Sequence, residues 1–102
     1  MAEFVHICAQ SELPSLNQVL EFSANGHVLC VANVGGVIAV LDGTCPHEGG
    51  PLGEGSIEDG KVVCPWHAFA FDVHTGAASD DPTMRAQVFE ARVEDGELRA
   101  KL

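Results

Sequence analysis

Four side chains of types that can bind metals lie in two short pairs, Cys45 with His47 and Cys64 with His67. The first pair reads Cys-Pro-His, the second reads Cys-Pro-Trp-His, and sixteen residues separate them. Two thiolates and two neutral imidazoles form a complete set of four ligands for a metal centre. Packing alone does not explain this spacing. The sequence therefore predicts a metal site held by Cys45, His47, Cys64 and His67.

The order of the ligands bears on which metal is bound. Zinc accepts two cysteines and two histidines in a tetrahedron, and the spacing alone does not exclude it. Zinc fingers usually keep the two cysteines together and the two histidines together, whereas here each loop carries one of each. Mixed pairs suit a binuclear iron centre in which each iron takes two ligands of one type, one from each loop. Prolines follow both cysteines and stiffen the loops, and glycines permit tight loop conformations at positions 43, 49, 50, 53 and 55.

The other residues of these types have simpler interpretations. Cys8 and Cys30 lie in apolar, strand-like runs, which predicts buried free thiols that act as small hydrophobic residues. The three remaining histidines, at 6, 27 and 74, fall outside the metal spacing and are expected on strands or the surface. Trp66 fits either a docking residue or a lid over the site. The sequence contains no nucleophile–base pair, phosphate loop or nucleotide fingerprint, so no catalytic site is expected.

Composition and charge restrict location and partners. The chain has 102 residues, 46% of them hydrophobic, and neither an apolar run of membrane-spanning length nor a signal peptide, so a cytoplasmic domain is expected. Fifteen acidic and five basic residues give a net charge of −10, and residues 42–81 carry −7 of it. This charge disfavours nucleic acid and anionic membranes and favours a basic protein face, although solubility alone also accounts for the total.

Short strand patterns recur between turn signals, and no segment shows sustained helical periodicity. The expected turns include Asn25-Gly26, Gly35-Gly36, Ser56–Lys61, Thr75-Gly76 and Glu94–Gly96. The sequence predicts an all-β antiparallel sandwich or barrel in a single domain, 1–102. A small metal-binding insert of about 42–72 is expected on a β base of about 1–41 and 73–102. The expected strands are Glu3–Ala9, Gln18–Ser23, His27–Asn33, Val37–Leu41, Lys61–Cys64, Phe69–Val73, Gln87–Val93 and Glu97–Leu102.

The two Cys/His pairs, with Phe71-Asp72, Thr75-Gly76 and a later loop at Pro82, resemble the Rieske-type ferredoxins. The resemblance covers essentially the whole chain and implies a Rieske-type fold with an inserted cluster-binding subdomain. It also implies one 2Fe–2S cluster, with Cys45 and Cys64 on one iron and His47 and His67 on the other.

The chain departs from the respiratory members of the family at two pairs of positions. Those members carry a disulfide that braces the cluster, and Gly50 or a neighbour and Trp66 stand at its positions here. They also carry Ser and Tyr hydroxyls that bond to sulfur, whereas this chain has Phe69 and Phe71, one expected to shield the cluster and the other to face the β core. Losing these bonds disfavours the reduced state, so a potential of about −150 mV, low for a Rieske centre, is expected.

The function implied by the resemblance is a low-potential carrier of single electrons. It would pass electrons from an NAD(P)H-dependent flavoprotein reductase to the terminal oxygenase of an aromatic-ring-hydroxylating dioxygenase system, itself being no enzyme. The small Rieske subunit of an assimilatory nitrite reductase is an alternative with the same cluster. An alternative of another class is a zinc-stabilised structural or interaction module.

Overall fold

Four two-residue turns join consecutive antiparallel strands. The computed structural model describes residues 3–46, 49–66, 69–79, 81 and 83–102. Both residues of each turn have a positive φ, with values of 51° and 81° at Asn25-Gly26, 61° and 94° at Gly35-Gly36, 51° and 75° at Asp59-Gly60, and 52° and 76° at Asp95-Gly96. This is the geometry of type I′ hairpins, which favours glycine and asparagine or aspartate. The hairpin turns expected at these four places are confirmed.

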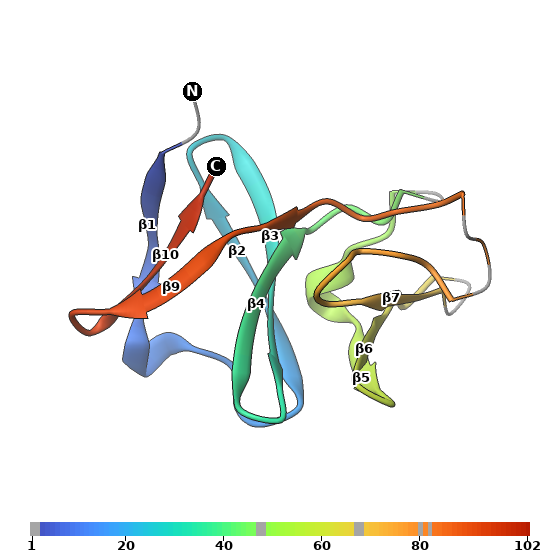
Figure 1. The fold of residues 1–102 in the computed structure, drawn as a ribbon, viewed down its shortest axis with the longest axis horizontal. Coiled ribbons are helices and arrows are strands. Elements are labelled where there is room, and N and C mark those ends of the chain that lie inside the picture. Colours follow the sequence, from blue (N-terminus) through green and yellow to red (C-terminus); the bar gives the residue numbers. More distant parts are fainter. Residues whose placement is uncertain (1–2, 47–48, 67–68, 80, 82) are drawn as a thin grey trace.

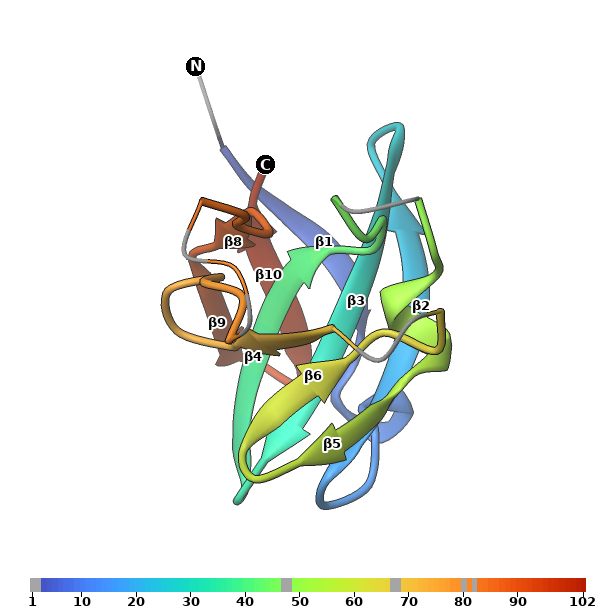
Figure 2. The same ribbon diagram turned by 90° about the vertical axis from the view of Figure 1, so that its right-hand side faces the viewer.

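The strands of the described residues form three antiparallel sheets, ordered β1-β10-β9, β2-β3-β4-β8 and β5-β6-β7. Figure 1 shows the β2–β4 strands between the β1-β10-β9 sheet and the β5–β7 sheet, and Figure 2 shows β5 and β6 in front of β3 and β4. The strands are β1 (Phe4–Ala9), β2 (Gln18–Ala24), β3 (His27–Val34), β4 (Val37–Asp42), β5 (Ser56–Glu58), β6 (Lys61–Val63), β7 (Ala70–Asp72), β8 (Val88–Phe89), β9 (Ala91–Glu94) and β10 (Glu97–Lys101).

The centre of the β2-β3-β4-β8 sheet is buried on both faces. Along β3, Leu29 and Val31 pack toward β1 and β10, whereas Cys30 and Ala32 pack toward the β5–β7 sheet. All four side chains have an exposed fraction of 0%. Successive side chains of a strand point to opposite faces, so one strand supplies two separate hydrophobic cores. The core that contains Cys30 and Ala32, called the first core below, also contains Cys45 and Cys64, so these two candidate ligands lie between the central sheet and the β5–β7 sheet; the core of Leu29 and Val31 is the second core.

The expected all-β class is confirmed, with differences in detail. The segment expected as one strand, Gln87–Val93, is two strands: β8 pairs with β4 and β9 pairs with β10. The single strand was wrong because the chain passes from one sheet to the other at Glu90, whose carbonyl accepts the N–H of Lys101 at 2.8 Å. Two short 3₁₀ helices, η1 (Gln10–Glu12) and η2 (Leu52–Glu54), complete the described elements. No helix in the described part of the chain is long and apolar enough to cross a membrane.

Candidate metal centre

The loop that carries Cys45, called the first ligand loop, follows β4 and is closed by backbone hydrogen bonds. The N–H of Cys45 donates to the carbonyl of Gly50 at 2.7 Å, and the N–H of Gly49 donates back to the carbonyl of Cys45 at 2.8 Å. Gly49 has a φ of +78°, which a side chain would disfavour. At the base of the loop, the Asp42 carboxylate accepts the N–H of Thr44 at 2.9 Å. These bonds hold Cys45 at a fixed place in the loop.

The second ligand loop joins β6 to β7. The N–H of Cys64 donates to the carbonyl of Phe69 at 2.8 Å, which closes the loop at its base. Within it, the backbone N–H of Trp66 bonds to the sulfur of Cys64. A proline directly after a cysteine favours such a turn, because its φ is already fixed. The sequence did not indicate this backbone donor.

The structure brings the two cysteines together. The side chains of Cys45 and Cys64 are hydrogen-bonded to each other, and their exposed fractions are 2% and 1%. Burial raises the pKa of the Cys64 thiol, the Trp66 N–H opposes this rise, and the neighbouring Cys45 adds to it. Two buried thiols in apolar surroundings become thiolates when a cation compensates their charge. This donor pair suits a metal centre.

Gly50 lies directly against Cys64. A Cβ atom at Gly50 would be 2.8 Å from the Cys64 sulfur and 3.1 Å from two carbons of the Trp66 ring. Gly50 and Trp66, the pair of positions assigned to the missing disulfide, therefore do lie side by side. All four cysteines of the chain are free. Trp66 covers this region only in part, since its exposed fraction is 49%.

A third segment, residues 84–86, lies beside the turn that follows β7. The N–H of Ala86 donates to the carbonyl of Gly76 at 2.8 Å, and the N–H of Ala78 donates to that of Met84 at 3.1 Å. Gly76 has a φ of +78°, and a Cβ there would be 1.9 Å from the Ala86 carbonyl oxygen. Only glycine fits this contact. Of the loop expected at Asp80, Asp81 and Pro82, the first and the last lie outside the described residues.

The packing of Phe69 and Phe71 differs from the expectation. Phe71 is fully buried in the first core with both cysteines, and Phe69 packs, partly buried, against that same core. The expectation that one would face the β core and the other the cluster was wrong. Both side chains therefore pack on the same core, the one that also contains Cys45 and Cys64.

His47 and His67 lie outside the described residues, and their role as ligands stays a prediction. Among the described residues alone, no group of three or more His, Cys, Asp or Glu side chains could hold a metal ion. The expectations for the remaining residues are confirmed: Cys8 and Cys30 are buried free thiols, and the histidines at positions 6, 27 and 74 are exposed.

Comparison with known proteins identifies the class. The family model described as "Rieske [2Fe-2S] domain" matches residues 3–99. The chain belongs to the Rieske [2Fe–2S] domain family, and its cofactor is a Rieske-type 2Fe–2S cluster. Between the two metals left open above, the family favours iron over zinc. The paired buried thiols and the space that Gly50 leaves beside Cys64 fit this cofactor.

The chain spans nearly the whole length of one relative but only a small part of another. The chain is 32% identical to ferredoxin CarAc of Metapseudomonas resinovorans over 98 residues, which are 93% of this chain and 90% of that ferredoxin. It is 38% identical to the vanillate O-demethylase oxygenase subunit of a Pseudomonas species over 65 residues, which are 64% of this chain and only 20% of that subunit.

A solved structure matches both in sequence and in fold. It is a complex of reduced oxygenase and oxidised ferredoxin in carbazole 1,9a-dioxygenase. One of its chains is 30% identical, with a TM-score of 0.83, and the match covers 96% of this chain and 92% of that one. The likeness thus includes the base sheets as well as the cluster loops.

Proposed function

We propose that this chain is a one-electron carrier that receives electrons from an NAD(P)H-dependent flavoprotein reductase and delivers them to a terminal aromatic-ring-hydroxylating oxygenase. The observation that carries the proposal is the match to ferredoxin CarAc along 93% of this chain and 90% of that ferredoxin. The chain matches that ferredoxin over nearly its whole length but only 20% of an oxygenase subunit, which supports the role of a carrier rather than a catalytic subunit. Its proposed location is the cytoplasm.

We assign Cys45 and Cys64 to one iron of the cluster and His47 and His67 to the other. When bound, the cluster supplies reversible uptake of a single electron. The described residues prepare the sulfur side: the two thiols lie together, and the Trp66 N–H bonds to one of them. Three fully buried apolar side chains exclude water there, those of Leu52, Val62 and Phe71.

The proposed potential lies at the low end of the Rieske range, about −150 mV. Phe71 packs in the same core as both cysteines and has no hydroxyl that could bond to sulfur. The net charge of −7 over residues 42–81 acts in the same direction, because an added electron is disfavoured in a negative region. The backbone N–H of Trp66 partly offsets both effects, since hydrogen bonds to sulfur stabilise the reduced cluster.

The acidic surface suits partners with basic docking faces. Complementary charge increases the rate of encounter and orients the two proteins before contact. Eight of the fifteen acidic residues lie between positions 42 and 81, the part of the chain that holds the proposed ligands. We therefore propose that both the reductase and the oxygenase meet this half of the carrier.

Two measurements test the function. Purified protein should contain two irons and two acid-labile sulfides per chain and give a rhombic electron paramagnetic resonance signal after reduction. With a reductase and an oxygenase from the same operon, NAD(P)H oxidation should then depend on the carrier and be coupled to product formation. Colourless protein with one zinc would refute the cluster, and a cluster-loaded protein that fails to reduce the oxygenase would refute the carrier role.

Variants test the assigned ligands. His47→Cys and His67→Cys should each alter or abolish the characteristic spectrum, because each replaces a neutral nitrogen ligand with a thiolate. His74→Cys is the matched control: His74 is an exposed residue outside the two loops, so the spectrum should be unchanged. Equal spectra for all three variants would refute the assignment.

A further inference from the structure

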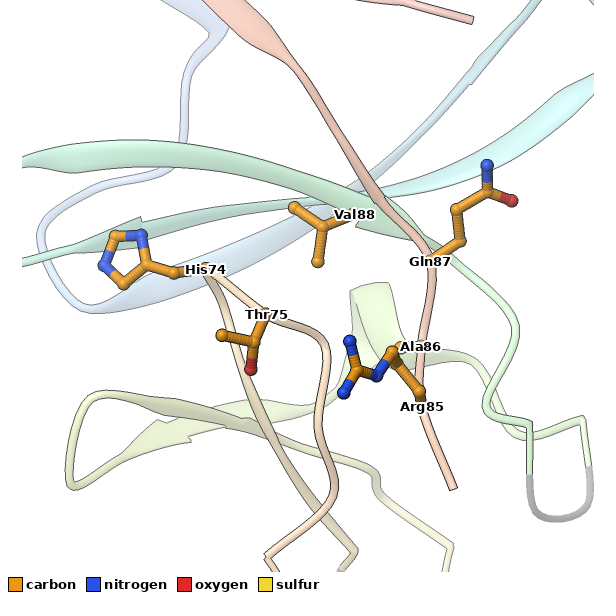
Figure 3. Close-up of a pocket in the computed structure, with 6 residues that line it drawn as sticks. All are labelled: His74, Thr75, Arg85, Ala86, Gln87 and Val88. Atoms are coloured by element: carbon orange, nitrogen blue, oxygen red, sulfur yellow. The ribbon is translucent and has the colours of Figure 1, made fainter. Parts of the chain in front are cut away.

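A groove of about 600 Å³ lies on the flank of the cluster-binding half, away from the two ligand loops. One wall is the turn after β7, and the other is the segment that leads into β8 (Figure 3). The groove is lined by His74, Thr75, Arg85, Ala86, Gln87 and Val88.

Hydrogen bonds fix both walls. The Asp72 carboxylate accepts the N–H groups of His74 and Thr75 at 2.8 and 3.0 Å, which holds the turn in place. The opposite wall is tied to that turn by the bond from Ala86 to Gly76 and to the base by the bond from the N–H of Asp42 to the carbonyl of Gln87, each of 2.8 Å. The groove is therefore a preformed feature of the fold.

Arg85 supplies the charge of the groove. Figure 3 shows its side chain directed toward the 74–75 turn, with Val88 between the two walls and Gln87 turned away. Arg92 and Arg99 each pair with a glutamate, at 3.6 and 2.6 Å. No carboxylate within the described ranges pairs with Arg85. Its guanidinium fork is thus available to an external oxygen acid, for which it is well shaped.

The neighbouring groups suit a carboxylate with an apolar stem. The Thr75 hydroxyl oxygen already accepts the N–H of Ala77 at 3.2 Å, so its own hydrogen can be donated outward. Ala86 and Val88 provide an apolar surface. A chain with a net charge of −10 repels a doubly charged phosphate more strongly than a single carboxylate.

We propose that this groove receives an acidic side chain of the terminal oxygenase and so fixes the orientation of the carrier in the complex. The inference rests on the proposed function. Arg85, His74 and Thr75 are all exposed, and one exposed ion pair changes affinity by only about fivefold or less. That is too weak to retain a free organic acid, but it selects among orientations of a complex that other contacts hold together.

The groove lies within reach of a partner that docks over the ligand loops. Strand β7 connects the two regions: Phe69, just before it, closes the Cys64 loop, and Asp72, at its end, holds the turn of the groove. Three residues of strand span roughly 10 Å. A standard interface covers about 800 Å² on each partner, which is roughly 30 Å across. A single positive charge away from the centre of an acidic face would then favour one rotation of the carrier on its partner over the others.

The test compares two variants with the same net charge. Arg85→Glu and Lys101→Glu each change the charge by two units, but Lys101 is an exposed residue of β10 in the base. Carrier concentration is varied in an assay with the complete reductase and oxygenase, once with the oxygenase limiting and once with the reductase limiting. A basic partner surface by itself predicts that both variants bind as well as or better than wild type.

Our proposal predicts the opposite for Arg85→Glu: about a fivefold to tenfold rise in the KM for the carrier when the oxygenase limits, with little change for Lys101→Glu. Arg85→Lys, which keeps the charge but loses the fork, should give an intermediate rise. Iron content and the reduced-state spectrum should match wild type in all three variants.

Three results would overturn the proposal. An unchanged or lower KM for Arg85→Glu would show that the groove is not part of the interface, and a rise confined to the reductase-limited assay would assign it to the other partner. If titration with benzoate changes the spectrum of the wild type but not that of Arg85→Glu, and the KM for the carrier is the same for both, the groove is a small-molecule site. A wild-type carrier that never reduces the oxygenase would instead refute the proposed function itself.

Discussion

The contact between Gly76 and Ala86 makes a quantitative prediction for Gly76→Ala. The φ of +78° places an alanine in the left-handed region, which costs about 1–2 kcal/mol. The new Cβ would also be 1.9 Å from the Ala86 carbonyl oxygen, so the two segments must separate by about 1.1 Å to reach 3.0 Å. That movement breaks the 2.8 Å hydrogen bond from Ala86 to Gly76.

Both residues are buried, so the freed N–H of Ala86 costs a further 1–3 kcal/mol or so. The expected loss of unfolding free energy is therefore about 2–5 kcal/mol, out of roughly 5–15 kcal/mol for a domain of this size. Each kcal/mol lowers the melting temperature by about 4–8 °C in a domain of 60–100 residues.

Gly26→Ala is the matched control. Gly26 has nearly the same φ, +81°, but no atom lies within 4 Å of the position of its Cβ. It should lose only the conformational part, about 1–2 kcal/mol. Denaturant unfolding of the cluster-loaded proteins, with iron content measured in parallel, separates the two effects. If Gly76→Ala is no less stable than Gly26→Ala, the close approach to Ala86 has no energetic importance and the reasoning is wrong.

Four further predictions concern the cluster, the core and the surface charges. Phe71→Tyr should raise the reduction potential by adding a donor near the cysteines, whereas Phe89→Tyr, in the second core, should leave it unchanged; a redox titration followed by electron paramagnetic resonance measures both. Cys8→Ser should keep the cluster spectrum but lose about 1–3 kcal/mol of stability, because it buries a hydroxyl in that second core. Backbone N–H donors hold the pKa of Asp72 below its ordinary 3.8, so its contribution to stability is present above that pH and is lost as the pH falls through the lower, folded-state value; Asp72→Asn should flatten this acid limb in unfolding experiments. Added salt should raise the KM for the carrier, and a salt-independent KM would show that the acidic surface serves solubility alone.

The features predicted correctly from the sequence were those encoded by adjacent residues. Asn25-Gly26 and Gly35-Gly36 specify their hairpins because few other residues adopt positive φ at both turn positions. The two Cys-Pro pairs predicted the loops that bring Cys45 and Cys64 together. In each case the determining chemistry lies within a few residues.

The features that were missed depend on residues far apart in the chain. Thr75-Gly76 identifies a turn, but nothing near it in sequence indicates that Ala86 lies against Gly76. The division of Gln87–Val93 at Glu90 likewise depends on which sheet each half meets. The error over Phe69 and Phe71 had a different origin, because the two-residue period of a strand already places them on one face.

The double use of β3 has a consequence for folding errors. Leu29 and Val31 serve one core, and Cys30 and Ala32 serve the other. A slip of one residue in the pairing of β3 would exchange the two sets. The larger side chains of leucine and valine would then replace those of cysteine and alanine in the core that contains Cys45 and Cys64. Such a molecule would also lose the two-residue turns at both ends of β3, and it would be recognised by its β content in the absence of iron.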